Sequence, residues 1–266
     1  MVKLGLCSSI GHFGNRCGAK DWPLLRVCRT LLMGTLPDMT QLVLWDIDGT
    51  LVHAGNVAGE VFDQTIERIT GLRPTGRVRM SGKTDPQITR EYLEMMGIEN
   101  IESSLQEILQ SLPRDLERQQ DLIREQGRVL PGIHAALDAV DALGGVEQAL
   151  LTGNLEENAR IKLKAFDLDH RFDFAVGAYG SDRHDRTELV PVALERFRRL
   201  RQREVAPHEV LVIGDSPNDL ACARAGGTRC LLVATGRSTF DELSELDPDF
   251  VMVNLQDTAT FLEALS

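Results

Sequence analysis

The sequence predicts an α/β fold, in which a doubly wound parallel sheet carries an inserted helical segment. Short apolar runs alternate with amphipathic helical patterns along the second half of the chain, which is typical of a parallel sheet covered by helices on both faces. Before them, residues 56–125 show helical periodicity almost throughout. A chain of 266 residues is long enough for a sheet domain with such an insert.

Residues 1–38 differ from the rest of the chain in charge and cysteine content. They hold five basic and two acidic residues, whereas the whole chain carries a net charge of −11. Three of the five cysteines lie in this stretch: Cys7, Cys17 and Cys28. Because it lacks a sustained apolar run, we expect a disordered leader or an upstream-start extension that ends before Met39. A weak resemblance to an organellar transit peptide is the alternative.

The composition argues against several classes of protein. An acidic chain with few, scattered aromatic residues does not suit a general nucleic-acid binder. No apolar run is long enough for a membrane helix. Only Cys222 and Cys230 lie beyond the leader, which predicts a reduced, cytoplasmic protein. We expect a monomer or a homodimer. A chain as acidic as this one would need a local cation to bind an anion.

The first expected strand is the apolar run 41–45, which ends at the polar turn Asp46-Ile47-Asp48-Gly49-Thr50. Apolar residues at helical spacing follow it, and helix-ending residues separate the segments. The expected helices cover residues 57–69 (before Gly71), 88–96 (before Gly97), 105–112 (before Pro113) and 116–123.

After Pro131-Gly132 the pattern alternates between helix and strand. The expected helices cover residues 133–143, 156–165, 189–200 and 220–225, with an aromatic run at 172–176. The expected strands cover residues 147–151, 210–213, 229–233 and 250–253. This alternation predicts that the strands pair in parallel with helical crossovers between them.

Three of the expected strands run directly into polar clusters. These are Asp46 to Thr50, Thr152-Gly153-Asn154, and Gly214-Asp215-Ser216-Pro217-Asn218-Asp219. Ligands of open parallel sheets bind beyond the carboxyl ends of the strands, so we expect the clusters to converge. Carboxylates that meet there need a cation, and oxygen ligands suit Mg²⁺. Each cluster alone is also typical of a turn or helix cap, but their joint placement favours a site.

These residues resemble the signatures of the haloacid-dehalogenase-like (HAD) hydrolases, and the closest resemblance is to the phosphoglycolate-phosphatase-like members. The matching stretches are Leu44 to Leu51, Leu151 to Asn154 and Gly214 to Asp219. The resemblance implies a Rossmann-like α/β core formed by residues 39–52 and 129–266. It also implies an α-helical cap formed by residues 53–128.

The resemblance further implies a role for each site residue. Asp46 would be the nucleophile, and Asp48 the general acid and then the base. Thr152 would bind a phosphoryl oxygen, with Thr50, Gly153 and Asn154 as further substrate-binding residues. Mg²⁺ would be held by Asp46, Asp215 and the backbone carbonyl of Asp48. Asp219 would support the metal shell or orient the cationic group. The two catalytic acids would need different pKa values.

The stretch from Gly180 to Pro191 departs from the family pattern, which usually has a lysine there. Arg186 is the best-placed cation and would replace it, with Arg183 in reserve. Lys162 and Lys164 lie one helix earlier. This departure keeps a non-catalytic relative under consideration.

The segment Ser81-Gly82-Lys83-Thr84-Asp85 lies between two expected cap helices. Lys83 or Arg79 could bind a distal anionic group of the substrate. Alternatively, Thr84 or Asp85 simply begins the next helix. A cap lysine also suggests a phosphonate hydrolase with a Schiff base, but a lysine beside a carboxylate favours the charged form.

The resemblance therefore implies a Mg²⁺-dependent phosphatase that acts on a small phosphorylated metabolite, such as phosphoglycolate, through an aspartyl-phosphate. The alternatives are a phosphotransferase or mutase, a phosphonate hydrolase, and a phosphate- or partner-binding relative without catalytic activity.

Overall fold

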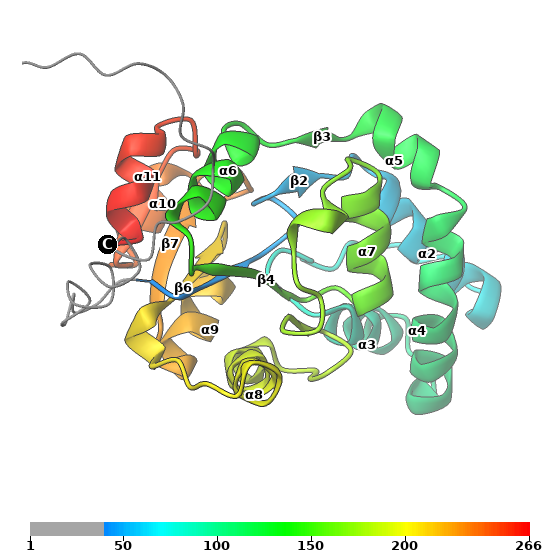
Figure 1. Ribbon diagram of the computed structural model, residues 1–266. Helices are drawn as coiled ribbons and strands as arrows, with labels where there is room; N and C mark the ends of the chain where they lie inside the picture. Colours follow the sequence, from blue (N-terminus) through cyan, green and yellow to red (C-terminus); the bar gives the residue numbers. More distant parts are fainter. Residues whose placement is uncertain (1–39) are drawn as a thin grey trace, which may run out of the picture. The chain divides into compact units, whose positions relative to one another are not determined.

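A computed structural model describes residues 40–266, so the predictions for the leader lie outside the described part of the chain. Six parallel strands form one sheet in the order β5-β4-β1-β6-β7-β8 (Figure 1). They are β1 (Leu42–Trp45), β4 (Glu147–Thr152), β5 (Ala178–Tyr179), β6 (Val210–Gly214), β7 (Arg229–Val233) and β8 (Phe250–Met252). The predicted parallel sheet is confirmed, and every strand expected from an apolar run is present.

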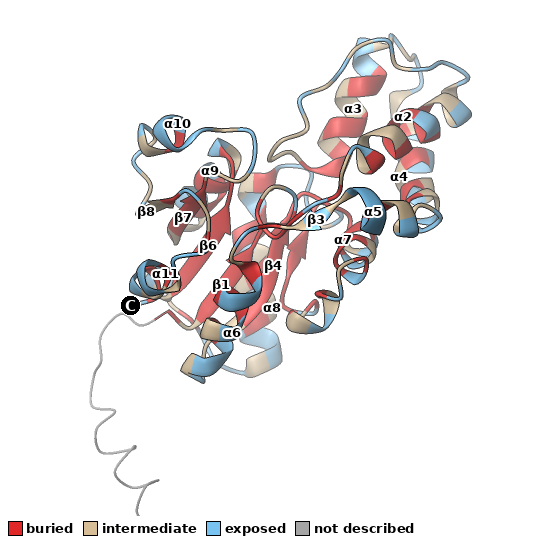
Figure 2. Cartoon of the chain, turned by 90° about the horizontal axis from the view of Figure 1, so that it is seen from above, coloured by how far each residue is buried: buried red, intermediate tan, exposed pale blue. Residues whose placement is uncertain are grey.

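Helices cover both faces of this sheet. Since side chains alternate along a strand, Leu42 and Leu44 pack on one face while Val43 and Trp45 pack on the other. The Val43 face is covered by α6 (Ile133–Leu143), α7 (Glu156–Lys164) and α11 (Thr258–Ala264). The Leu42 face is covered by α8 (Leu189–Arg201), α9 (Pro217–Gly226) and α10 (Phe240–Ser244). Figure 2 shows the strands as buried between these layers, which confirms the doubly wound fold.

A helical cap is inserted after the first strand. Two short segments, β2 (Val52–His53) and β3 (Arg128–Val129), pair antiparallel where the chain leaves and re-enters the core. Between them lie α2 (Val57–Thr70), α3 (Asp85–Met95), α4 (Ile101–Glu117) and α5 (Gln120–Gln126). Apolar side chains of these helices form a hydrophobic cluster of their own, which extends to Leu155 and Ala165 at the two ends of α7. The expected helical cap is therefore present.

The ends of the cap helices follow from local sequence. Helix α2 ends at Gly71, whose φ of 73° lies in the left-handed region that glycine adopts at little cost. Helix α3 begins at Thr84, whose side chain accepts a hydrogen bond from the Gln87 N–H at 3.2 Å.

One predicted helix end is wrong. The helix expected to stop before Pro113 continues as α4 to Glu117, with the proline inside it. A proline inside a helix removes one backbone hydrogen bond and costs about 3 kcal/mol. Leu112 and Leu116, on either side of Pro113, are both buried in the cap. Burial of this apolar face outweighs the local cost of the proline.

The strand order brings the three polar clusters together. Strand β1 lies between β4 and β6, so the residues that follow these three strands are neighbours at one edge of the sheet. The predicted convergence at the carboxyl ends is therefore built into the topology. Within residues 40–266, no helix has the length and apolar composition needed to cross a membrane.

Candidate active site

Asp46 is the first residue after the central strand. Its backbone N–H donates to the Ile213 carbonyl at 2.9 Å, which continues the pairing with β6 and fixes the residue at the sheet edge. Its side chain is buried, and Oδ1 accepts a hydrogen bond from Arg186 Nη2 at 2.9 Å. Since Arg186 occupies Oδ1, the other carboxylate oxygen is the one available to a reacting group.

Arg186 is the buried cation of the site. It lies in a short 3₁₀ turn (Arg186–Glu188) that begins at Asp185, whose side chain accepts from the Thr187 N–H at 2.9 Å. Its Nη2 also donates to Asp219 Oδ1 and, at 3.4 Å, to the Leu151 carbonyl. Burial lowers the pKa of Arg186, but the Asp219 and Asp46 carboxylates raise it by more, so the guanidinium stays charged.

Arg186 thus occupies the position in which the sequence predicted a substitute for the usual lysine. Arg183, the reserve candidate, lies on the exposed side of the same loop with Glu188 at 3.4 Å.

Helix α9 holds the two remaining acids at its N-terminal end. Asp219 Oδ2 accepts hydrogen bonds from the Ser216 N–H at 3.0 Å and the Ser216 hydroxyl at 2.6 Å. With Oδ1 on Arg186, both oxygens of Asp219 are occupied, so this residue orients the cation. Asp215 is buried, and its Oδ1 accepts a long 3.5 Å hydrogen bond from Thr50.

Carboxylate oxygens of Asp46, Asp215 and Asp219 lie within 4.8 Å of one another. The side chain of Asp48 is not part of this cluster, so its predicted share in metal binding rests on its backbone carbonyl. Two glycines leave room for the Asp215 carboxylate. A Cβ on Gly49 would lie 2.6 Å from Oδ2, and one on Gly236 would lie 1.6 Å from it. This close, all-oxygen cradle fits a hard cation such as Mg²⁺.

The carboxylates of the cluster repel one another. Burial and the charges of Asp219 and Asp46 raise the pKa of Asp215 to about 9. Burial also raises the pKa of Asp46 to about 7, against the lowering effect of Arg186. A divalent cation bound here would supply the opposite charge that keeps both acids ionised.

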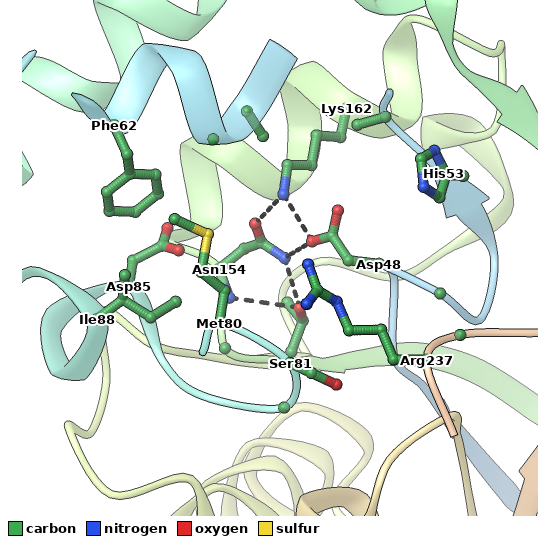
Figure 3. A pocket seen from close by; sticks show the side chains of 18 of the residues that line it. Asp48, His53, Phe62, Met80, Ser81, Asp85, Ile88, Asn154, Lys162 and Arg237 are labelled. Atoms are coloured by element: carbon green, nitrogen blue, oxygen red, sulfur yellow. Dashed lines mark hydrogen bonds and ion pairs between the residues drawn. The ribbon is translucent and has the colours of Figure 1, made fainter. Parts of the chain in front are cut away.

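Asp48 lies in a polar network with Asn154 and Lys162 (Figure 3). Lys162 Nζ donates to Asp48 Oδ2 and to Asn154 Oδ1, each at 2.6 Å. Asn154 Nδ2 donates to Asp48 Oδ2 and to Thr152 Oγ1, each at 2.8 Å. Burial opposes ionisation of Asp48, but the Lys162 ammonium lowers its pKa below the usual value.

Sequence reasoning did not assign Lys162 to the site. The available signal was its place on helix α7, four residues after Asn158 and three after Ala159, both buried. A lysine on the inward face of an amphipathic helix is unusual and points to a buried partner. Only 7% of its side chain is exposed.

Some of the remaining predicted residues line the cavity of the site, and others do not. Thr152, Gly153 and Asn154 line the cavity that contains Asp46 and Asp48. Thr50 contacts Asp215 and does not line the cavity. The Lys83 ammonium pairs with Glu91 of helix α3 and does not line it either. The structure therefore gives no support to a substrate contact by the Lys83 side chain.

The backbone around Lys83 does reach the site. A Cβ on Gly153 would lie 2.0 Å from the Lys83 carbonyl oxygen, so only glycine permits this approach. Next to it, the Asp85 N–H donates to the Gly153 carbonyl at 2.7 Å, and Asp85 Oδ2 accepts from the Leu155 N–H at 2.8 Å. These contacts fasten the cap segment onto the core at the edge of the cavity.

Comparison with known proteins identifies the family. The haloacid dehalogenase-like hydrolases match residues 40–227, which is more than half of the chain. The chain belongs to this hydrolase family. A phosphoglycolate phosphatase of Pseudomonas fluorescens is 27% identical over 234 residues, covering 85% of this chain and 80% of that protein. A protein of Caldanaerobacter subterraneus subsp. tengcongensis, provisionally named pyrophosphatase PpaX, is 27% identical over 218 residues, covering 80% and 90%.

Solved structures show the same fold. A hydrolase from Pseudomonas syringae superposes with a TM-score of 0.64 at 19% identity, covering 84% of this chain and 98% of that one. This hydrolase is therefore a HAD superfamily member that is similar to phosphoglycolate phosphatases along most of its length.

The candidate active site opens into a cavity of about 730 Å³ beneath the cap. Its floor holds Asp46, Asp48, Thr152 and Arg186, and its walls come from the cap and from the loop after β7. That loop contributes Arg237, an exposed cation that the sequence analysis did not single out.

The candidate metal site makes a prediction about stability. The folded-state pKa values of Asp46 and Asp215 lie above the usual value of an unfolded aspartate, about 3.9. The metal-free folded protein therefore binds more protons than the unfolded chain from about pH 4 to about pH 9. Its free energy of unfolding should fall as the pH rises through this window, by at most about 1.4 kcal/mol per pH unit for each group.

Urea titrations in EDTA and in saturating Mg²⁺, at about pH 5.5 and about pH 8.5, measure this effect. We expect Mg²⁺ to stabilise the fold more at the higher pH, because the ion binds ionised carboxylates. Equal stabilisation at both pH values would contradict the assignment of these acids to the metal.

The Lys162 contact makes a second prediction. Replacing Lys162 with methionine should lower kcat by about 10- to 100-fold, because Asp48 loses a group that holds its carboxylate. Since Lys162 lowers the pKa of Asp48, the limb of the pH–rate profile that reports Asp48 should move to higher pH. Lys164 is exposed on the same helix, so Lys164→Met is the matched control. An unchanged profile in Lys162→Met would remove Lys162 from the reaction.

Proposed function

We propose that this chain is a Mg²⁺-dependent phosphatase that hydrolyses a small phosphomonoester through an aspartyl-phosphate on Asp46. The observation that carries the proposal is the surroundings of Asp46. Its carboxylate is buried at the end of the central strand, beside a charged arginine and two further carboxylates, at the floor of a large cavity.

In the first step, the free carboxylate oxygen of Asp46 forms a bond to phosphorus while the bond from phosphorus to the alcohol oxygen breaks. Asp48, in its protonated form, gives its proton to the departing alcohol. In the second step, Asp48 takes a proton from a water molecule that attacks phosphorus. Inorganic phosphate leaves and the Asp46 carboxylate is restored.

Other groups of this chain assist at fixed positions. The Arg186 guanidinium neutralises charge at Asp46, and Asp219 holds that guanidinium in place. Thr152 lines the cavity, and its hydroxyl accepts a hydrogen bond from Asn154 Nδ2, which leaves its own proton for a phosphoryl oxygen. Mg²⁺ held by Asp46 and Asp215 would supply positive charge that orients the phosphoryl group and offsets its negative charge.

The same geometry argues against two of the alternatives. The non-catalytic alternative depends on the missing lysine, but Arg186 places a cation beside Asp46 instead. The phosphonate hydrolase needs an uncharged lysine in the cap, whereas the Lys83 ammonium is paired with Glu91. A phosphotransferase or mutase would use the same residues, so it differs only in the group that accepts the phosphoryl.

A phosphate-release screen over small metabolite phosphates, with and without Mg²⁺, tests the proposal. Phosphoglycolate is the first substrate to test, because relatives carry the name phosphoglycolate phosphatase. We expect release that requires Mg²⁺ and that does not depend on an added acceptor alcohol. No release from any phosphomonoester by protein shown to bind Mg²⁺ would favour the non-catalytic alternative.

A further inference from the structure

The cavity above the catalytic acids has two chemically different sides. Figure 3 shows Asp48, Lys162 and Arg237 on one side and Phe62, Met80 and Ile88 on the other, where the only labelled charged group is the Asp85 carboxylate. The second group belongs to an apolar wall formed by the cap: Phe62, Val78, Met80, Ile88 and Tyr92. A phosphate bound on the floor would therefore have a hydrocarbon surface facing the organic part of the ester.

The apolar wall is a continuation of the cap's own hydrophobic core. Phe62 of α2, together with Ile88 and Tyr92 of α3, belongs to the buried cluster of the cap, and Val78 and Met80 pack against it. These side chains are buried or half-buried, so little of the wall faces bulk solvent. An apolar group placed against it would gain roughly 0.8 kcal/mol per buried CH₂.

The cations that line the cavity are bound by carboxylates or lie away from this wall. Lys162 is bound to Asp48, and Arg186 is bound to Asp46 and Asp219. Arg77, next to Val78, also lines the cavity, and its guanidinium pairs with Asp63 at 2.8 Å. Arg237 lies across the cavity from the wall and, within residues 40–266, takes part in none of the ion pairs. A carboxylate that pointed at the wall would find no free cation there.

The size of the cavity also favours a substrate with a larger organic part. A volume of about 730 Å³ lies within the range of about 300–1,000 Å³ that accommodates drug-sized ligands. A two-carbon acid phosphate would leave most of this space unfilled.

We infer that the substrate of this chain is the phosphate ester of an alcohol with an apolar body longer than two carbons. Its phosphoryl group would lie on Asp46, and its hydrocarbon body would lie against Phe62 and Met80. This inference rests on the proposed phosphatase function, and it names the substrate class of the same site.

Two matched series of substrates test the inference: n-alkyl phosphates from methyl to hexyl, and ω-carboxyalkyl phosphates, of which phosphoglycolate is the shortest. We expect kcat/KM to rise about three- to fourfold per methylene along the alkyl series. At equal length, we expect the carboxylated ester to be the poorer substrate. A flat alkyl series, or a preference for the carboxylated esters, would overturn the inference and leave the phosphatase proposal intact.

A pair of variants tests whether the rise of kcat/KM with alkyl length depends on the apolar wall. Met80→Gln should reduce the ratio of kcat/KM for hexyl over methyl phosphate by about tenfold. Leu72→Gln makes the same chemical change on the exposed surface of the cap and should leave the ratio as it is, because Leu72 is 53% exposed. Equal ratios in both variants would remove the wall from substrate recognition.

A binding measurement separates the two claims. Calorimetric titration of the Mg²⁺-loaded wild-type protein with hexylphosphonate and methylphosphonate needs no turnover. Tighter binding of hexylphosphonate by tenfold or more supports the apolar subsite even if the phosphatase proposal fails. Equal affinities overturn the subsite whatever the activity.

Discussion

Replacing Arg186 with methionine should both destabilise the fold and abolish turnover. The side chain is 6% exposed and makes contacts to two buried carboxylates, those of Asp46 and Asp219. Removing one partner from such a cluster leaves buried charge uncompensated, at a cost of about 3–5 kcal/mol. Urea unfolding at neutral pH measures the loss of stability, and phosphate release measures the loss of kcat.

Two controls separate charge from packing. Arg186→Lys keeps the positive charge that the family usually places here, so it should recover part of both stability and kcat. Arg183→Met removes an exposed arginine from the same loop and should change neither. An Arg186→Met protein with wild-type stability and kcat/KM would show that this cation has no part in the site.

Replacing Asp46 with asparagine should reduce kcat/KM by about four orders of magnitude or more, because the amide cannot attack phosphorus. The change keeps the shape of the side chain and removes one of three mutually repelling buried acids. We therefore expect a folded protein whose unfolding free energy at about pH 8 is not reduced. Phosphate release and urea unfolding on the same preparation measure both quantities.

The matched control is Asp121→Asn, which makes the same chemical change at a fully exposed side chain on the cap. It should leave kcat/KM unchanged. Turnover that persists in Asp46→Asn would contradict the covalent mechanism, whatever the identity of the substrate.

The sheet and the position of the site could be predicted because they depend on local patterns. Each apolar run that became a strand is short and is followed by a polar turn, as at Trp45 and Asp46. Once the strands are parallel, their carboxyl ends share one edge, so the three clusters must meet there. No knowledge of side-chain packing is needed for that step.

The contacts of individual cations could not be predicted, because they depend on how helices rotate and pack. Lys162 reaches Asp48 from a helix far along the chain, and the sequence shows only that it lies on the buried side of α7. Lys83 seemed well placed in a cap loop, but a glutamate eight residues later on α3 binds its ammonium. The prediction that a helix ends before Pro113 was wrong for a related reason, because tertiary packing outweighed the local cost of the proline.

The central claim is that a phosphoryl group is bonded to Asp46 during turnover. Rapid mixing with substrate and Mg²⁺, followed by acid quenching and peptide mass spectrometry, tests it most directly. We expect the peptide that contains Asp46 to gain the mass of one phosphoryl group in the wild-type protein, and no such gain in Asp46→Asn. Turnover under the same conditions with no phosphorylated peptide, or with the phosphoryl group on another residue, would contradict the account.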